Sequence, residues 1–126
     1  MSGDGSMTSD YAETLQEFNA AFNRHDVEAM MGLLIDGCVF ENTYPPPSGT
    51  RYEGQSAVRS YWEDFFRDAP QAVIEIEEMV ILGDRGFQRW TYRWDRDRGG
   101  TGFVRGVDVV RFESGKIAEK SSYVKG

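Results

Sequence analysis

The chain has 126 residues, 40% of them hydrophobic, enough for the core of one domain but not of two. Its formal net charge of -7 repels phosphate backbones, which argues against nucleic acid as a partner. One cysteine and one histidine exclude an intramolecular disulfide and make cysteine- or histidine-based metal sites improbable, and no apolar run approaches the ~18 residues of a membrane span.

The single Cys38 suits a reducing compartment, so we expect a cytoplasmic protein. No residue pattern implies a metal or an organic cofactor, and none is expected. The first nine residues are mostly small and polar, and no signal-peptide pattern opens the chain. We therefore expect a disordered tail over residues 1–9, a single domain over residues 10–126, and no membrane partner.

The first predicted helix begins at Asp10, because Glu13 follows three residues later, the spacing of a capping box. An apolar stripe runs along this helix at helical spacing. Its members are Tyr11, Leu15, Phe18 and Phe22.

Two further helices are predicted in the first half of the chain. The second covers residues 27–35, with Asp26 as its N-cap and Gly37 at its C-terminal stop. The third covers residues 57–69, with Ser56 as its N-cap. Its wide apolar face includes an aromatic run that contains Trp62.

A short strand and a proline-rich loop separate the second and third helices. Residues 38–43 (CVFENT) are predicted as the strand, with Phe40 and Asn42 on one face. Residues 44–54 contain three successive prolines, so they cannot form a helix or a central strand. This loop is either a lid over a cavity, with Tyr44 touching a ligand, or a surface connection.

From Gln71 onward the apolar period changes to two, which predicts four antiparallel strands. They are expected at residues 72–82, 87–95, 103–112 and 117–125. The adjacent Glu77 and Glu78 interrupt the alternation as a β-bulge would. Helices followed by strands indicate an α+β fold, with three N-terminal helices packed on a curved antiparallel sheet to form a cone with an internal pocket.

One acid stands out in the third long strand, RGVDVVRF. Asp108 shares a face with Val104, Gly106, Val110 and Phe112 and is the only charged residue of that row. An unpaired buried carboxylate is costly, so Asp108 has either a functional role or a structural partner. A backbone donor could be that partner. The neighbouring arginines of the strand lie on its opposite face, which disfavours a direct local ion pair.

The second long strand places Trp90 and Tyr92 on one face, as pocket lining or as core. Taken together, the segments AAFNRHD, LLIDGCVFEN, YEGQSAVRSYWEDFF and RGVDVVRFESGKIAEKSSYVK resemble the SnoaL-like branch of the nuclear-transport-factor-2-like superfamily. The resemblance covers residues 10–125. This superfamily contains ketosteroid isomerase, polyketide cyclases, limonene epoxide hydrolase and scytalone dehydratase, so the resemblance implies a fold rather than one function.

Carried over residue by residue, the resemblance gives partial matches. The segment DVVRF resembles the D-x-x-R-F of ketosteroid isomerases, which implies that Asp108 stands where their oxyanion-holding acid does. Asn42 stands at the place of their general base and Phe18 at the place of their tyrosine donor. The segment FENTYPPP resembles the water-holding stretch of limonene epoxide hydrolase, with Asn42 at its asparagine and Phe40 at its tyrosine.

Polyketide cyclases of the SnoaL type imply a simpler site, in which one pocket acid suffices. We therefore expect a SnoaL-like protein that binds a small apolar molecule, cyclic or open-chain, and uses Asp108 and Asn42 for isomerase, cyclase or hydrolase chemistry. The alternatives are a non-catalytic binding module and a dimerisation module of the same fold. The resemblance also implies a homodimer formed through the outer sheet face. The expected ligand-binding residues are Phe18, Phe22, Phe40, Tyr44, Trp62, Trp90 and Tyr92.

Overall fold

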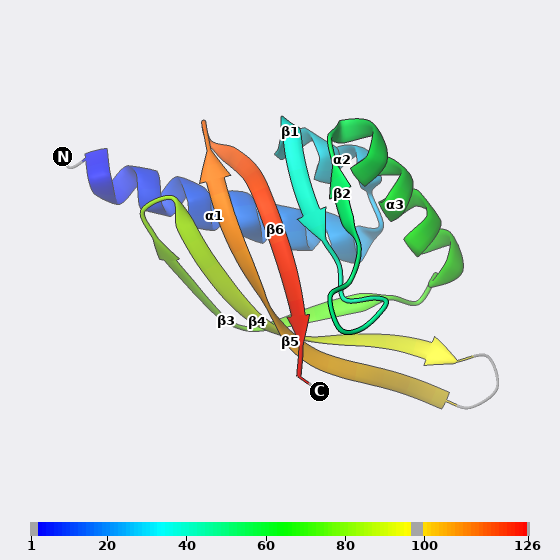
Figure 1. Cartoon of the computed structure of the whole chain (residues 1–126). Helices are drawn as coiled ribbons and strands as arrows, with labels where there is room; N and C mark the ends of the chain where they lie inside the picture. Colours follow the sequence, from blue (N-terminus) through cyan, green and yellow to red (C-terminus); the bar gives the residue numbers. More distant parts are fainter. Residues whose placement is uncertain (1–2, 97–99, 126) are drawn as a thin grey trace.

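The computed structural model describes residues 3–96 and 100–125, and the side chains of residues 11–94 and 102–125. Three helices pack against one curved six-stranded sheet (Figure 1). The helices are α1 (Gly3–Arg24), α2 (Val27–Gly32) and α3 (Gln55–Asp68). The strands are β1 (Leu34–Glu41), β2 (Arg51–Glu53), β3 (Val73–Leu82), β4 (Arg85–Arg96), β5 (Gly100–Glu113) and β6 (Lys116–Val124). The predicted α+β fold is confirmed.

The strands are arranged in the order β2-β1-β6-β5-β4-β3. Strands β3 to β6 form the predicted antiparallel meander, and the expected bulge lies between Ile76 and Glu78. Two features were not predicted. Strand β1 joins β6 in parallel, so the sheet is not purely antiparallel, and β2 adds a three-residue edge strand inside the segment predicted as a loop. Both pairings are non-local, which local periodicity does not report.

The helix boundaries differ from the prediction at three points. Helix α1 begins at Gly3 rather than Asp10, so residues 3–9 extend the helix instead of belonging to a separate tail. These residues contain no proline and no apolar stripe, so the sequence pattern gave no reason either to break the helix there or to extend it. Residues 1 and 2 lie outside the described residues.

Helix α2 begins as predicted, since the Asp26 side chain accepts a hydrogen bond from the Ala29 amide at 3.1 Å. It ends at Gly32, before the predicted end at residue 35, because Leu34 pairs with Ile117 of β6 in the sheet. Sheet pairing has overridden the helical propensity of these residues. Gly37 therefore lies inside β1 and does not end a helix.

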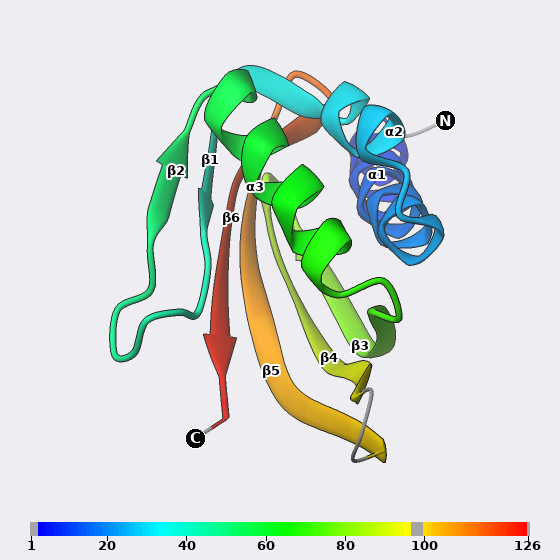
Figure 2. The same ribbon diagram turned by 90° about the vertical axis from the view of Figure 1, so that its right-hand side faces the viewer.

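Helix α3 has Gly54 at its N-cap, not Ser56, and no side chain caps it. The Gln55 side-chain amide instead donates to the carbonyl oxygens of Leu34 and Ile35 at 3.1 and 3.2 Å, which fastens the start of α3 to the start of β1. Helix α3 consequently crosses the concave side of the sheet, the same side that α1 covers (Figure 2). The buried stripe of α1 faces this side, where Phe112 of β5 stacks on Tyr11 with ring centroids 4.6 Å apart.

The lengths and compositions of the helices show whether any of them could cross a membrane. Among the described residues, no helix is both long enough and apolar enough to cross a bilayer.

Candidate functional site

Asp108 lies in the centre of the sheet, where three strands place polar side chains in one row. The register pairs Asp108 of β5 directly with Gln88 of β4 on one side and with Ser122 of β6 on the other. The Gln88 amide donates to Asp108 Oδ2 at 2.9 Å, and the Ser122 hydroxyl donates to Oδ1 at 2.6 Å. Only 1% of Asp108 is exposed. The carboxylate thus has partners from neighbouring strands rather than from the arginines of its own strand.

A second hydrogen-bonded pair fixes Gln88 from the helix side. Asn19 of α1 donates to Gln88 Oε1 at 2.8 Å and accepts from Gln88 Nε2 at 3.1 Å. Both side chains are buried. Because the amide of Gln88 is held in this orientation, its remaining N–H is directed at Asp108.

Lys120 is the positive charge of this cluster, and sequence analysis did not select it. It pairs with Val110, two residues along each strand from the Asp108–Ser122 pair and therefore on the same face of the sheet. Its Nζ lies 3.5 Å from Asp108 Oδ2 and 3.4 Å from Ser122 Oγ. Its ammonium also lies over the ring of Phe40, 4.7 Å from the centroid, a distance typical of a cation–π contact. Only 8% of Lys120 is exposed.

This polar cluster borders a cavity of about 360 Å³ between the sheet and α3. Most of its wall is aromatic or aliphatic, and Asp108, Lys120 and Ser122 are among its few polar members. A volume of this size falls within the range of small-molecule sites. The apolar and aromatic side chains of the wall are Phe22, Phe40, Tyr44, Tyr61, Trp62, Phe65, Ile74, Trp90, Tyr92, Trp94, Val104 and Val124.

The structure places six of the seven predicted ligand-binding residues in this wall; they are Phe22, Phe40, Tyr44, Trp62, Trp90 and Tyr92. Phe18 is the exception. It is 2% exposed and packs in the core, with its ring centroid 5.9 Å from Lys120 Nζ, and it does not line the cavity. A role for these residues in binding stays a prediction.

Asn42 also borders the cavity, but its side-chain oxygen holds the proline-rich loop. Asn42 Oδ1 accepts from the backbone amides of Thr50 at 2.7 Å and Tyr44 at 3.2 Å. Gly49 has a positive φ of 75° and packs against the Asn42 carbonyl, where a side chain would not fit. These contacts favour a structural role for Asn42, and its predicted catalytic role has no geometric support beyond its position.

Two tyrosines of the wall, Tyr61 and Tyr92, have raised pKa values. Burial raises the pKa of Tyr61, an effect that a hydrogen bond with Asn42 partly offsets. Burial likewise raises the pKa of Tyr92, to about 12. Both hydroxyls can therefore act as neutral hydrogen-bonding groups at ordinary pH.

Trp90 contributes a buried donor to the same wall. Its ring lies over Gly106 of β5, whose missing side chain leaves the space that the ring fills, since a Cβ there would lie 2.6 Å from the indole. Its Nε1–H is buried and has no hydrogen-bond partner among the described residues. An orphaned buried N–H is uncommon, so this donor calls for an explanation.

Comparisons with known proteins agree with this architecture. The profile of the SnoaL-like domain matches residues 15–120. A protein of unknown function from Mesorhizobium loti, described as NTF2-like, is 36% identical, covers 94% of this chain and 93% of its own, and superimposes with a TM-score of 0.80. The chain belongs to the SnoaL-like family.

More distant solved structures share only the fold of this SnoaL-like protein. An NTF2-like protein of unknown function from Burkholderia pseudomallei is 19% identical over 92% of this chain and 91% of its own, with a TM-score of 0.79. TerC, crystallised with polyporic acid, is 16% identical over 92% of each chain, also with a TM-score of 0.79. A search of curated proteins gave no match.

Proposed function

We propose that the cavity binds a small, largely apolar and cyclic molecule, with its polar end at the cluster of Asp108, Lys120 and Ser122. The observation that carries this proposal is the combination of an aromatic wall with a buried ion pair in one cavity of about 360 Å³. A wall that only filled a core would need no charged group, because burying charges is costly. The crystallisation of TerC, a protein of the same fold, with polyporic acid is consistent with this use of the fold.

We further propose acid–base chemistry of the isomerase, cyclase or hydrolase kind at this end of the cavity. The Lys120 side chain is 10% exposed and that of Asp108 only 1%, so a ligand would meet Lys120 and Ser122 before Asp108. The Ser122 hydroxyl donates to Asp108, and it could pass a proton between a ligand and the carboxylate. Asp108 would then act as the proton acceptor behind Ser122.

A non-catalytic binding module is the second candidate. Both oxygens of Asp108 already accept short hydrogen bonds, at 2.6 and 2.9 Å, which also suits a fixed polar cluster that only orients a ligand. Conversion of a bound ligand separates the two functions. Turnover that is lost in Asp108→Asn supports an enzyme, and binding without conversion in the wild type supports the module.

We also propose a homodimer formed through the outer sheet face. Apolar side chains are exposed there in one cross-strand row, Val80, Phe87 and Val109. Sedimentation equilibrium would test this, with a monomer at micromolar concentration as the contrary result. A reducing, cytoplasmic location remains our proposal, and the single buried Cys38 supports it.

The binding proposal has a built-in reporter, because all three tryptophans of the chain border the cavity. We expect saturable changes in tryptophan fluorescence when the protein is titrated with cyclic apolar compounds such as 2-adamantanone. Val104→Phe should fill part of the cavity and weaken binding about tenfold or more. Val107→Phe makes the same substitution on the outer face of the same strand, outside the apolar row proposed for the dimer, and should leave binding unchanged.

Three results would speak against a binding site. They are the absence of saturable binding by any such compound, an equal loss in both variants, and no co-purified small molecule in native mass spectra. Intact binding in Val104→Phe would instead place the ligand elsewhere.

A further inference from the structure

The polar groups of the cavity differ in how well their hydrogen-bonding capacity is used. The short hydrogen bonds of the cluster belong to Asp108, while the long contacts belong to Lys120. We propose that the ligand carries a neutral carbonyl-type oxygen, an acceptor without a charge, and that Lys120 Nζ is the group that binds it. This inference rests on the proposed function and names the ligand's polar chemistry.

Lys120 carries three N–H donors and is 8% exposed. Hydrogen bonds between an ammonium and an oxygen usually measure about 2.7–2.9 Å. Among the described residues, its polar contacts are Ser122 Oγ at 3.4 Å and Asp108 Oδ2 at 3.5 Å, both well beyond that range. The ring of Phe40 at 4.7 Å stabilises the charge without accepting a normal hydrogen bond. Lys120 therefore retains capacity for one good acceptor.

Trp90 provides a second, independent hydrogen-bond donor that lacks an acceptor. Within the part of the chain that the structure describes, its Nε1–H is a buried side-chain donor without a partner, and Trp90 borders the same cavity. No buried side-chain acceptor of the described residues is left in this state. The unmatched groups that border the cavity, the Trp90 N–H and the loosely paired Lys120 ammonium, are both donors, so a ligand that supplies an acceptor complements them.

The charges of the cavity favour a neutral ligand. The ionised groups of the wall are Asp108 and Lys120, whose charges cancel, and the raised pKa values of Tyr61 and Tyr92 keep these two hydroxyls neutral. An anionic or cationic ligand would leave one uncompensated charge in a largely apolar cavity, which costs more than a neutral dipole. Ketones, quinones and lactones meet these conditions, whereas carboxylates, phosphates and amines do not.

Such binding also has a chemical consequence. A positive donor at a carbonyl oxygen withdraws electron density and stabilises the negative charge that develops there during enolisation or ring closure. Lys120 would supply this stabilisation, and Asp108 would accept a proton through Ser122. Lys120 would then act as the electrophilic group and Asp108 as the base.

The test uses two compounds of the same shape, 2-adamantanone and 2-methyleneadamantane, in which a C=CH2 group replaces the C=O group. Because their hydrophobicity differs, the measured quantity is the ratio of their two dissociation constants, compared between variants by tryptophan fluorescence or calorimetry. We expect Lys120→Met to reduce the preference for the ketone about tenfold or more. Lys116→Met, an exposed lysine of the same strand, should leave the ratio unchanged.

Three further arms complete the design. Trp90→Phe keeps an aromatic ring, although a smaller one, and removes the N–H; it should reduce the preference a few-fold. Lys120→Met could fail to fold because the buried Asp108 carboxylate loses its positive partner. In that case the double variant Asp108→Asn/Lys120→Met, which removes both charges, is measured instead of the single variant. In the wild type, adamantane-1-carboxylate and 1-adamantylamine should both bind more weakly than the ketone.

The outcomes separate this inference from the proposed function. If both neutral compounds bind and their ratio is the same in the wild type and Lys120→Met, the carbonyl inference is wrong while cavity binding stands. Tighter binding of the carboxylate or the amine would also overturn it. If no adamantane compound binds, both the proposed function and this inference fail.

Discussion

The two faces of the central strands contain the same kinds of charged groups in opposite surroundings. On the concave face, the Asp108–Lys120 pair lies among aromatic rings, with side chains 1% and 10% exposed. On the outer face, Arg89 pairs with Glu77 at 3.3 Å and with Glu78 at 3.2 Å, and the arginine side chain is 49% exposed. Water screens the outer pairs, while the inner charges depend on each other. Burial, rather than the presence of an ion pair, distinguishes the candidate site.

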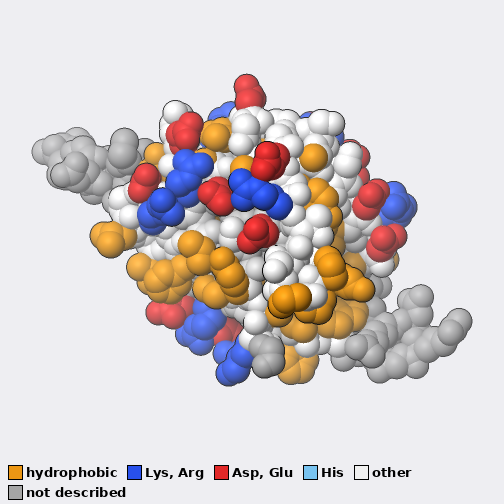
Figure 3. All heavy atoms as spheres, in the orientation of Figure 1, with side chains coloured by type: hydrophobic (Ala, Val, Ile, Leu, Met, Phe, Trp, Pro, Cys, Tyr) orange, Lys and Arg blue, Asp and Glu red, His pale blue; other side chains and the backbone are white. Residues whose placement is uncertain are grey.

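The outer face has its own pattern. Hydrophobic side chains gather in its lower part and charged ones lie mainly above them (Figure 3).

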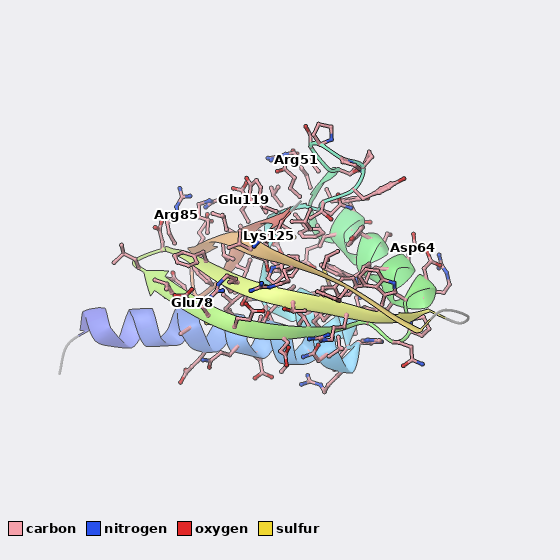
Figure 4. The ribbon with its side chains drawn as sticks, turned by 90° about the horizontal axis from the view of Figure 1, so that it is seen from below. Arg51, Asp64, Glu78, Arg85, Glu119 and Lys125 are labelled. Atoms are coloured by element: carbon pink, nitrogen blue, oxygen red, sulfur yellow. The ribbon has the colours of Figure 1, made fainter. Side chains whose placement is uncertain are left out.

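Charged side chains at the periphery, such as Asp64 of α3 and Arg85 of β4, project away from the body of the molecule (Figure 4). Their side chains are 62% and 65% exposed. Peripheral charges of this kind favour solubility and contribute little to stability.

The largest predicted effect is at Lys120. Lys120→Met leaves the Asp108 carboxylate buried without its positive partner, so we expect a loss of about 3–5 kcal/mol in the free energy of unfolding. Urea denaturation measures this loss. Asp108→Asn/Lys120→Met should recover a large part of it, because it removes both charges. A loss below about 1 kcal/mol in the single variant would show that the inner pair behaves like a surface pair.

A smaller effect is expected at Gly106, where the inner face has space for the Trp90 ring only because no side chain is present. A Cβ at Gly106 would overlap the Tyr123 carbonyl oxygen and lie 2.6 Å from the Trp90 ring, so Gly106→Ala should displace both and cost about 1–3 kcal/mol, the usual range for overpacking. Thermal denaturation and the tryptophan emission maximum report both changes. Gly37→Ala is the matched control, since no atom lies within 4 Å of a Cβ at that position. Equal stability of the two variants would contradict the close packing of the Trp90 ring and the Tyr123 carbonyl around Gly106.

The third effect appears only in alkali. Burial raises the pKa of Tyr92 to about 12, above the ordinary value of about 10, so the folded state keeps this proton longer than the unfolded chain. The stabilisation is fully present below about pH 10 and is lost as the pH rises through about 12. Absorbance at 295 nm should show a late tyrosine step that Tyr92→Phe reduces and Tyr123→Phe does not. A titration of all tyrosines near pH 10 in the folded protein would contradict burial of Tyr92.

The smallest effect is expected on the outer face. Arg93 lies 3.7 Å from Glu75, and both side chains are about half exposed or more. Arg93→Met should change the free energy of unfolding by less than about 1 kcal/mol, in contrast to the same type of substitution at Lys120. Urea denaturation in low salt gives the most sensitive comparison. A loss as large as that of Lys120→Met would remove the distinction between the two faces.

Local periodicity predicted much of this structure. Alternation placed Asp108 on the concave face, and it placed Trp90 and Tyr92 there as well, because side-chain direction in a strand follows from residue number alone. Lys120 was missed although β6 alternates in the same way. Its significance depends on the β5–β6 register, which brings it near Asp108, and on the ring of Phe40 from β1. Such contacts join distant segments and leave no local signal.

Asn42 is the opposite case: its position was predicted from the sequence, but its role was not. Its position beside the cavity followed from the strand pattern and the family resemblance. Its hydrogen bonds to Tyr44 and Thr50 depend on the path of the proline-rich loop, which no periodicity describes. Likewise, the early end of α2 follows from the pairing of Leu34 with Ile117.

The most direct test of the account is a crystal structure of the wild-type protein with 2-adamantanone. We predict that the cage occupies the cavity between Trp62, Trp90 and Tyr92, with its carbonyl oxygen within hydrogen-bonding distance of Lys120 Nζ. A ketone bound on the outer sheet face, or bound in the cavity with its oxygen directed away from Lys120, would contradict the account.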